Sequence, residues 1–461
     1  MKVGFITLGC DKNTVDTERY LAELSDYGGE FTRELNDADV IIVNTCGFID
    51  AAKKESIDAM IEAARYKTDG ACKAVVGVGC MIERHKAELM EALPEVDLFL
   101  GASESGRLAQ ELAERGIVGR DPIALHPGVR IYTGDLPHVR YLKISEGCDH
   151  GCAFCAIPLM RGKHRSFSLG EIIREAQLLE VQGAKEINLV AQDLAHYGRD
   201  IRDGVRLPEL LESLVAETSL PWIRMLYLYS TGITPRLLEV VANETRILPY
   251  LDMPMQHASD AVLARMRRPE RKRTIRDRVA RFREAVPGVA IRTTCIVGFP
   301  GETDQDFDEL LEFLEETQFD RVGAFTYSPQ EGTHAAGMVD DVPDPVKRER
   351  LERLTELQRS ITAERYEGRL GASSRVLVDR IDESGRTVGR LPWQADDVDG
   401  VTFLDESVSP GDFVDVVVEE VVDDYDFSAT VVRRIESVAP RPIARNSRAL
   451  PMAATIGTYG R

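Results

Sequence analysis

The first 134 residues alternate short apolar runs with segments of helical periodicity. Three apolar runs, at residues 2–8, 38–43 and 73–78, are each followed by a helical pattern, and this unit repeats about every 35 residues. Parallel strands are joined by crossover helices of this kind. We therefore predict an open parallel α/β sheet over residues 1–134.

The alternation continues beyond residue 135 and predicts a second, larger parallel sheet. Helical patterns at 169–181 and 306–317 begin after Ser168 and Thr303, which are suitable N-caps. The candidate strands are 139–144, 186–190, 223–229, 250–255, 290–297 and 321–327. Six strand–helix units are too few to close the usual eight-unit barrel. We predict a partial, open-sided (β/α)6 barrel over residues 135–366, ending in a charged helix at 344–366.

The pattern changes again after residue 366, where short Val-rich strands are separated by Gly and Asp turns. Examples of these strands are 376–379, 401–404 and 413–418. Their number and spacing predict a small all-β barrel over residues 367–436. The last segment, 437–461, contains three Pro and four Arg without periodicity. We expect it to be a disordered tail.

Composition narrows the functional classes. The chain has 57 Lys and Arg against 77 Asp and Glu, a net charge of −20 that disfavours broad binding of nucleic acid. No apolar run approaches the roughly 18 residues of a membrane span, and the N-terminus lacks the features of a secretion signal. We expect a soluble protein of the reducing cytoplasm. There, eight cysteines indicate metal binding or catalysis rather than disulfides.

Three cysteines form a compact array directly after the first strand of the predicted barrel. Cys148, Cys152 and Cys155 have CxxxCxxC spacing. One loop of this kind can supply three thiolates to an iron–sulfur cube and leave the fourth iron without a protein ligand. A zinc site made by these cysteines, with or without His150 or His164, is the alternative.

Three further cysteines are far apart in the chain but equivalent in the repeat. Cys10, Cys46 and Cys80 each follow an apolar run at the same phase, and each has a glycine neighbour. Because the carboxyl ends of parallel strands share one edge of a sheet, we expect these cysteines to converge there. The alternative is that they are small buried hydrophobic residues. Cys72 and Cys295 fit neither pattern and are predicted to be core thiols.

The compact array resembles that of the radical S-adenosylmethionine superfamily, and the resemblance covers residues 139–327. It implies that Cys148, Cys152 and Cys155 hold a 4Fe-4S cluster. The open iron of this cluster would bind S-adenosylmethionine, whose reductive cleavage gives a 5'-deoxyadenosyl radical. Phe154, just before the third cysteine, matches the aromatic residue that the superfamily often places against the adenine.

Two cysteine triads in this order resemble those of the methylthiotransferases, over residues 1–436. The strings that carry the resemblance are residues 9–18, 44–50, 145–148, 158–162, 296–303 and 325–329. The resemblance implies a second 4Fe-4S cluster on Cys10, Cys46 and Cys80, and a TRAM-like identity for the C-terminal barrel. It also implies that one S-adenosylmethionine is the radical source and a second supplies the methyl group.

Polar residues at the ends of two predicted barrel strands are candidate contacts of the cofactor. Gln192 and Asp193 end the second strand, and Gln256 and His257 end the fourth. The barrel arrangement places all four at its mouth. By resemblance, some of them contact S-adenosylmethionine or the substrate. The alternative is that they only cap the helices that follow.

Two further features near the mouth have both a functional and a structural interpretation. Arg161 belongs to a basic patch with Lys163, His164 and Arg165, which would steer the carboxylate of the cofactor or of a substrate aspartate, or would only form a solvated loop. Gly298 follows the fifth strand. It would permit close approach of an adenine or serve an ordinary tight turn.

The methylthiotransferases divide by substrate, and the chain is more similar to one group. Some members modify an adenosine of transfer RNA, whereas another group modifies the β-carbon of an aspartate in protein twelve of the small ribosomal subunit. The strings 44–53, 251–257 and 422–427 resemble the second group. The residues 368–436 contain sixteen Asp and Glu, seven Arg and no Lys. So acidic a module suits a basic protein partner better than an RNA backbone.

We therefore expect an aspartate methylthiotransferase that acts on this ribosomal protein, free or within the ribosome. We also expect a monomeric enzyme that receives electrons from a low-potential donor such as flavodoxin or ferredoxin. We expect no specific nucleic acid partner and no membrane partner. The alternatives are a transfer-RNA methylthiotransferase and a non-catalytic protein, either a two-cluster electron carrier or a zinc scaffold.

Overall fold

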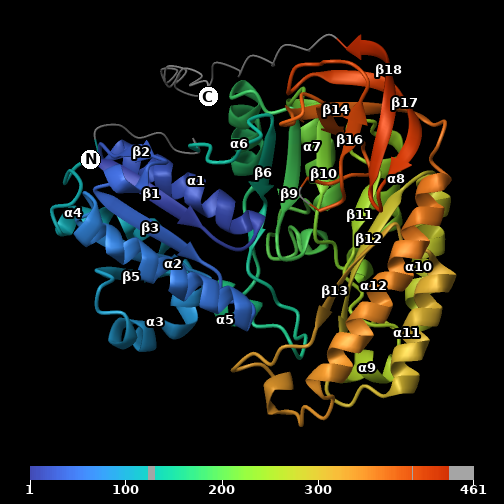
Figure 1. The fold of residues 1–461 in the computed structure, drawn as a ribbon, viewed down its shortest axis with the longest axis horizontal. Coiled ribbons are helices and arrows are strands. Elements are labelled where there is room, and N and C mark those ends of the chain that lie inside the picture. Colours follow the sequence, from blue (N-terminus) through green and yellow to red (C-terminus); the bar gives the residue numbers. More distant parts are fainter. Residues whose placement is uncertain (123–129, 397, 436–461) are drawn as a thin grey trace.

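The computed structural model describes residues 1–122, 130–396 and 398–435, which form three parts in chain order (Figure 1). The predicted disordered tail, 437–461, lies outside the described residues. Within the described ranges, no helix combines the length and the hydropathy needed to cross a bilayer.

The first part is a parallel five-stranded sheet with the strand order β2-β1-β3-β4-β5. Its strands are β1 (Lys2–Thr7), β2 (Glu30–Thr32), β3 (Val40–Thr45), β4 (Ala74–Gly79) and β5 (Leu98–Gly101). Its helices are α1 (Asp11–Asp26), η1 (Leu35–Asp37), α2 (Asp50–Asp69), α3 (Cys80–Ala92), η2 (Ala102–Arg107) and α4 (Leu108–Glu114). Every residue of β3 and β4 is buried, because separate hydrophobic cores cover the two faces of the sheet.

The order of the strands creates a ligand-binding position between β1 and β3. The chain runs from β1 outward to β2 and then returns to the other side of β1 to form β3. The loops that follow β1 and β3 therefore diverge to opposite faces of the sheet and leave a crevice at its carboxyl edge. Cys10 and Cys46 lie in these two loops.

The central part contains the six predicted parallel strands. They are β6 (Val139–Lys143), β9 (Glu186–Val190), β10 (Trp222–Met225), β11 (Tyr250–Asp252), β12 (Ala290–Val297) and β13 (Arg321–Thr326). They form two three-stranded sheets, which meet where Leu228 N donates to Asp252 O at 2.7 Å. Among the described strands, β6 and β13 are the outer edges and do not pair with each other. The barrel is thus partial and open, as predicted.

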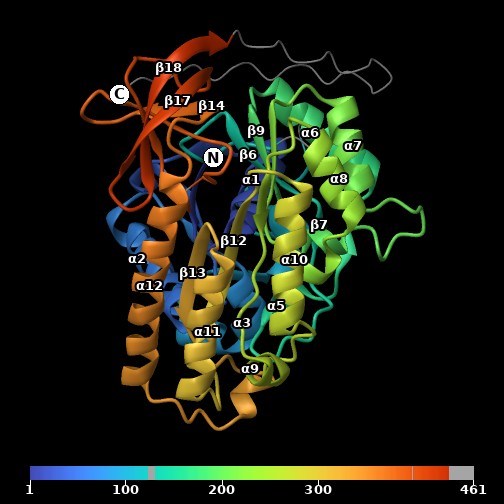
Figure 2. The ribbon, with the colours of Figure 1, turned by 90° about the vertical axis from the view of Figure 1, so that its right-hand side faces the viewer.

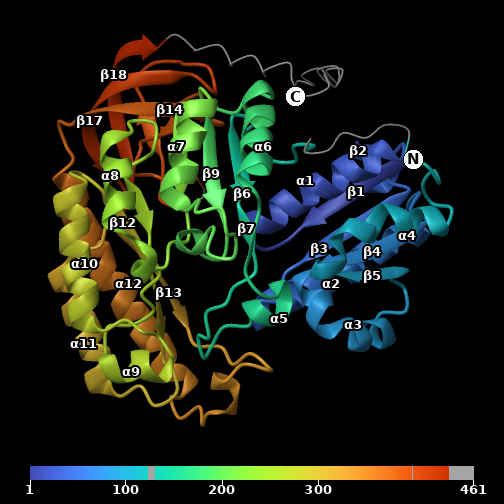
Figure 3. The same cartoon turned by 180° about the vertical axis from the view of Figure 1, so that it is seen from behind.

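A continuous layer of helices covers the outside of this open barrel (Figures 2 and 3). The long helices are α6 (Leu169–Val181), α7 (Leu207–Glu217), α8 (Pro235–Asn243), α10 (Lys272–Ala285), α11 (Asp304–Thr317) and α12 (Asp344–Glu367). The short elements are β7 (Ser145–Glu146), α5 (Ile157–Arg161), β8 (Arg165–Ser166), η3 (Leu194–His196), η4 (Ser230–Gly232), α9 (Asp260–Arg265) and η5 (Ala335–Gly337). Ser168 and Thr303 cap α6 and α11 as predicted, since each side chain accepts a hydrogen bond from the backbone three residues later.

The third part is a closed five-stranded barrel with the strand order β14-β15-β16-β18-β17. Its strands are β14 (Ser373–Ile381), β15 (Thr387–Arg390), β16 (Thr402–Leu404), β17 (Phe413–Val422) and β18 (Asp426–Ile435). Helix α12 packs along β13 and leads directly into this barrel (Figure 1). The predicted all-β module is confirmed.

Candidate active site

One cavity of about 450 Å³ lies where the carboxyl ends of the N-terminal strands face the carboxyl ends of the central strands, and both cysteine triads line it. The cysteines in its wall are Cys10, Cys46, Cys80, Cys148, Cys152 and Cys155. The predicted convergence of the dispersed triad, and its position opposite the compact array, are therefore confirmed. Cys72 and Cys295 lie in hydrophobic cores, as predicted.

Glycines allow the loops that carry the dispersed triad to approach each other. Gly9 has a φ of +93°, and a Cβ on it would lie 2.8 Å from Cβ of Cys46. Gly79, which precedes Cys80, has a φ of +101°, and its Cβ would lie 2.5 Å from Oδ1 of Asn44. Only glycine combines this backbone conformation with so close an approach. The glycine neighbours noted in the sequence therefore have a packing role.

The side chain of Asn13 ties two of these loops together. Its Nδ2 donates to the carbonyl of Leu8 at 2.7 Å and to the carbonyl of Thr45 at 3.2 Å. Leu8 follows β1 and Thr45 ends β3, so this amide bridges the crevice between the two strands. Cys10 is the N-cap residue of α1 and Cys80 is the first residue of α3. Helix N-termini favour negative charge, which suits thiolate ligands.

The compact array lies in a loop that begins and ends in the small hairpin β7–β8. Ser145 pairs with Ser166 in this hairpin, and Cys148 N donates to Gly162 O at 3.1 Å. The guanidinium of Arg268 approaches the Cys152 sulfur at 3.8 Å and stacks over the ring of Tyr229. These contacts hold the loop in one conformation against the mouth of the barrel.

Burial raises the pKa of two thiols in the dispersed triad, Cys46 and Cys80, and of two in the compact array, Cys148 and Cys155. The pKa rises to about 11 for Cys80, to about 11 for Cys148 and to about 12 for Cys155. Thiols with such values are protonated at neutral pH unless a cation is bound, so metal binding would release protons from the site. The two sets of three thiols in one cavity have the donor chemistry that iron–sulfur clusters require.

The geometry is unfavourable for a single tetrahedral zinc ion, whose sulfur ligands lie about 3.8 Å apart at Zn–S distances of 2.3 Å. In the part of the chain that the structure describes, the candidate metal ligands that lie within 4.8 Å of one another are those of His150, Asp193 and His196, and not those of either cysteine triad. The candidate fourth ligands are also engaged elsewhere. His150 pairs with Asp193 at 2.8 Å, and His164 contacts Ser166 at 3.0 Å.

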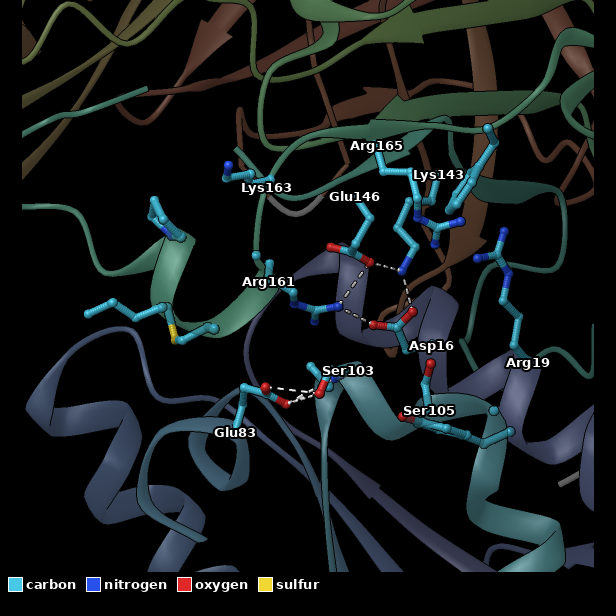
Figure 4. Close-up of a pocket in the computed structure, with 18 of the residues that line it drawn as sticks. Asp16, Arg19, Glu83, Ser103, Ser105, Lys143, Glu146, Arg161, Lys163 and Arg165 are labelled. Atoms are coloured by element: carbon cyan, nitrogen blue, oxygen red, sulfur yellow. Dashed lines mark hydrogen bonds and ion pairs between the residues drawn. The ribbon is translucent and has the colours of Figure 1, made fainter. Parts of the chain in front are cut away.

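Arg161 forms part of the wall between the cluster cavity and a second cavity of about 610 Å³ (Figure 4). Its guanidinium donates to Asp16 at 2.6 Å, pairs with Glu146 at 3.2 Å and donates through Nε to the Cys80 sulfur at 3.0 Å. Lys143 pairs with the same two carboxylates. We call Asp16, Lys143, Glu146 and Arg161 the interdomain ion cluster, since it joins α1 to the compact cysteine loop.

This cluster changes the interpretation of the basic patch. Burial alone would raise the pKa of Asp16. The positive charges of Lys143 and Arg161 outweigh this effect of burial and hold the pKa of Asp16 well below its usual range. The donors of Arg161 are thus already occupied by residues of the protein, whereas Lys163 and Arg165 are exposed. Sequence reasoning missed the partners of Arg161. The lysine inside the apolar strand 139–143 is the signal that could have found them.

The other predicted contacts divide into two groups. Phe154, Gln192 and Gln256 line the cluster cavity. The carboxylate of Asp193, in contrast, binds His150 and the backbone N of Ala195, which caps η3.

His257 and Gly298 also lie outside the residues that line the cavity. His257 is fully buried, accepts from Ser259 N at 3.0 Å and faces Glu302. Gly298 has a φ of +71°, and a Cβ on it would lie 2.3 Å from Cγ of Lys347. The geometry therefore agrees with a turn packed against α12.

Sequence reasoning also missed several residues of the cavity wall. Lys12 and Tyr227 lie beside the dispersed triad. Asp252 ends β11, Arg292 lies within β12, and Arg268 lies in the loop between α9 and α10. Lys12 follows Cys10 by two positions, so its proximity was implicit in the motif. The other four lie in or after central strands and in the loop between α9 and α10, and the apolar pattern does not show which of their side chains face the cavity.

An open (β/α)6 barrel that carries a three-cysteine loop after its first strand defines the class of radical S-adenosylmethionine proteins, whose loop holds a 4Fe-4S cluster and whose cofactor is S-adenosylmethionine. Models of known families agree with this class. Residues 2–101 match the uncharacterized protein family UPF0004, residues 142–314 the radical SAM superfamily and residues 370–432 the TRAM domain.

Relatives that match nearly the whole chain give the family. The chain is 43% identical to "Ribosomal protein uS12 methylthiotransferase RimO" of Anaeromyxobacter sp. (strain K) over 452 residues, which cover 96% of each chain. It is 40% identical to the protein of the same name from Geobacter sulfurreducens, over 94% of this chain and 98% of the relative. The chain belongs to the RimO family of ribosomal protein uS12 methylthiotransferases.

Solved structures with little sequence similarity share the fold. The radical S-adenosylmethionine methyltransferase TsrM from Kitasatospora setae aligns with a TM-score of 0.52 at 12% identity, over 71% of this chain and 73% of that one. The cobalamin-dependent S-adenosylmethionine radical enzyme OxsB aligns with a TM-score of 0.50 at 14% identity, over 79% of this chain and 56% of that one. These likenesses bear on the fold alone.

Proposed function

We propose that the protein adds a methylthio group to the β-carbon of an aspartate in ribosomal protein uS12. The observation that carries this proposal is the single cavity lined by both cysteine triads. A protein that only transferred electrons would need no room for a substrate between its clusters. The RimO relatives, which match 94% or more of this chain, support the substrate.

The donor sets fit two 4Fe-4S clusters, one on Cys148, Cys152 and Cys155 and the other on the dispersed triad. When bound, the first cluster supplies the electron that cleaves S-adenosylmethionine, and the second carries the sulfur that is methylated and transferred. Each triad would provide three protein ligands to such a cluster, one fewer than its four irons.

The remaining residues of the site position these groups. Arg268 and Tyr229 fix the compact loop beside Cys152. Arg161 fixes Cys80 relative to that loop, so that the two triads keep a constant separation. Phe154 and Gln192 contribute cavity wall on the side of the compact array, and we assign both to binding of S-adenosylmethionine.

The C-terminal barrel supports a basic protein partner, because its sixteen acidic residues outnumber its seven arginines. We propose that this barrel recognises uS12 and has no specific affinity for nucleic acid. The substrate is a ribosomal protein, so we place the reaction in the cytoplasm. We further propose a monomeric enzyme that receives electrons from a low-potential donor such as flavodoxin or ferredoxin.

The division of labour between the triads can be tested with anaerobically reconstituted enzyme, dithionite, S-adenosylmethionine, sulfide and uS12. Cys148→Ala should abolish formation of 5'-deoxyadenosine, because the electron no longer reaches the cofactor. Cys10→Ala should retain formation of 5'-deoxyadenosine but transfer no sulfur to uS12. Liquid chromatography of the nucleoside and mass spectrometry of uS12 measure the two outcomes.

Cys72→Ala is the matched control, because this core thiol lies outside the cavity wall, and it should support both steps. Continued sulfur transfer by Cys10→Ala would show that the dispersed triad does not carry the sulfur. Absence of 5'-deoxyadenosine from the wild-type protein would show that it is a carrier or a scaffold.

A further inference from the structure

Lys12 brings a buried positive charge to the wall of the cluster cavity. It is the second residue of α1 and only 8% exposed. Its ammonium lies 3.4 Å from the centre of the Tyr227 ring, and the hydroxyl of Tyr227 donates to Asp11 at 3.2 Å. Within the described residues, no side-chain hydrogen bond or ion pair of 4 Å or less joins Lys12 to another group.

The other cations of this cavity already have carboxylate partners. Arg161 pairs with Asp16, Arg268 with Glu270 at 3.2 Å and Arg292 with Asp252 at 3.3 Å. Lys12 differs because its ammonium contacts the face of the Tyr227 ring and, within the described residues, pairs with no carboxylate at 4 Å or less. A buried charge without a partner is costly, so an unpaired ammonium in a cavity favours binding of an anion.

The carboxylate of Asp252, which also lines the cavity, does not remove the preference of Lys12 for an anion. Burial raises the pKa of Asp252, and the positive charge of Lys12 opposes that rise only weakly. Arg292 is the stronger influence on Asp252 and forms its ion pair. The ammonium of Lys12 is therefore the charge that a new anion entering the cavity would meet without first displacing a partner.

We propose that Lys12 binds the side-chain carboxylate of the aspartate that is modified. This inference rests on the proposed function, and it names the residue that selects the substrate. Lys12 lies between Cys10 and Asn13 at the dispersed triad, so a carboxylate held there brings the adjacent β-carbon next to the group that delivers sulfur. An adenine ring has no carboxylate, so the same contact discriminates against transfer RNA.

The test measures the affinity of the holoenzyme for uS12, with S-adenosylhomocysteine in place of the reactive cofactor. Two forms of uS12 are compared, the natural one and one whose target aspartate is replaced by asparagine. Wild-type enzyme should bind the aspartate form about tenfold more tightly, since a hydrogen bond between two charged groups is stronger than one to a neutral amide. Lys12→Met should bind both forms equally.

Two further variants separate binding from folding. Lys12→Arg keeps the positive charge and should restore part of the discrimination. Lys73→Met removes an exposed lysine that pairs with Asp39, far from the cavity wall, and should behave as the wild type. Iron content and thermal unfolding report whether each variant is assembled.

The outcomes that overturn the inference are distinct. If Lys12→Met keeps the tenfold preference for aspartate, Lys12 does not hold the substrate carboxylate. If it weakens binding of S-adenosylhomocysteine and leaves the aspartate preference intact, Lys12 serves the cofactor instead. If wild-type enzyme never modifies uS12, the proposed function itself fails, whatever the behaviour of Lys12.

Discussion

At the scale of single residues, the structure separates side chains that belong to the cavity from those that hold it in shape. Arg161 illustrates the distinction, because its position in a basic patch suggested binding of an anion from outside. In the structure it contacts Asp16, Glu146 and the Cys80 sulfur, all of them within the protein. We propose that Arg161 positions the dispersed triad relative to the compact loop.

This role predicts a loss of stability when Arg161 is replaced. Arg161→Met leaves the Asp16 and Glu146 carboxylates with one cation, Lys143, instead of two. Removing one partner from a buried ion pair costs about 3–5 kcal/mol. Urea denaturation of the reduced apoprotein should show a lower midpoint for this variant. Arg165→Met, at an exposed neighbouring position, should change stability by no more than about 0.5 kcal/mol.

The same cluster predicts a dependence of stability on pH. The folded protein holds the pKa of Asp16 below its usual value of 3.8, so the unfolded chain binds more protons at acidic pH. The stabilisation is complete above that usual value and is lost as the pH falls through the lower value of the folded state. The stability difference between wild type and Asp16→Asn should therefore stay constant near neutral pH and shrink below about pH 4. A constant difference down to acid unfolding would contradict this account.

At the scale of elements, buried ion pairs fix the C-terminal barrel to the central sheet. Arg390 of β15 pairs with Glu186 of β9 and with Asp379 of β14, each at 2.7 Å. Asp379 also contacts His138, which precedes β6, and Glu186 binds Arg224 of β10. The barrel is thus joined to β9 and to the residue before β6 by groups that are excluded from water.

Replacement of Arg390 should loosen this interface. Arg390→Met leaves Glu186 with one partner and Asp379 with only His138, which predicts a destabilisation of about 3–5 kcal/mol. Limited proteolysis should then cut between α12 and β14 more rapidly than in the wild type. Arg375→Met, which removes an exposed ion pair with Asp415 on the outside of the same barrel, is the control and should digest at the wild-type rate. Equal digestion of both variants would argue against docking through Arg390.

The elements could be predicted from the sequence to the extent that they are long and apolar. The patterns at 186–190 and 290–297 agree with β9 and β12 at both ends. The strands β2 and β5 have only three and four residues at the edges of their sheet, too few for a periodicity to appear. The hairpin β7–β8 has two residues in each strand and depends on pairing across the cysteine loop.

At the scale of the whole molecule, the site exists because helix α1 joins two domains. Asp16 and Arg19 of α1 pair with Lys143 and Glu175 of the central part, and Tyr227 donates to Asp11. These contacts turn the carboxyl edge of the N-terminal sheet toward the mouth of the open barrel (Figure 1). Both triads then line one cavity.

The sequence could predict each triad but not the contacts that bring the two together. Spacing places Cys148, Cys152 and Cys155 in one loop, and the repeat places the other three cysteines on one edge of a sheet. The pairing of Asp16 with Lys143 depends on how two separately folded units dock, and the hydrophobic pattern of either unit carries no information about that. The orientation of Lys12 into the cavity also depends on how the two units dock.

In the proposed function the two triads act together on one aspartate of uS12. Mass spectrometry of uS12 from cells with and without this gene tests it most directly. We expect one aspartate of uS12 to gain the mass of a methylthio group in place of hydrogen, only when the gene is present and both triads are intact. Unmodified uS12 in the presence of the intact gene, or a modification that survives loss of either triad, would show that the two triads do not act together on uS12.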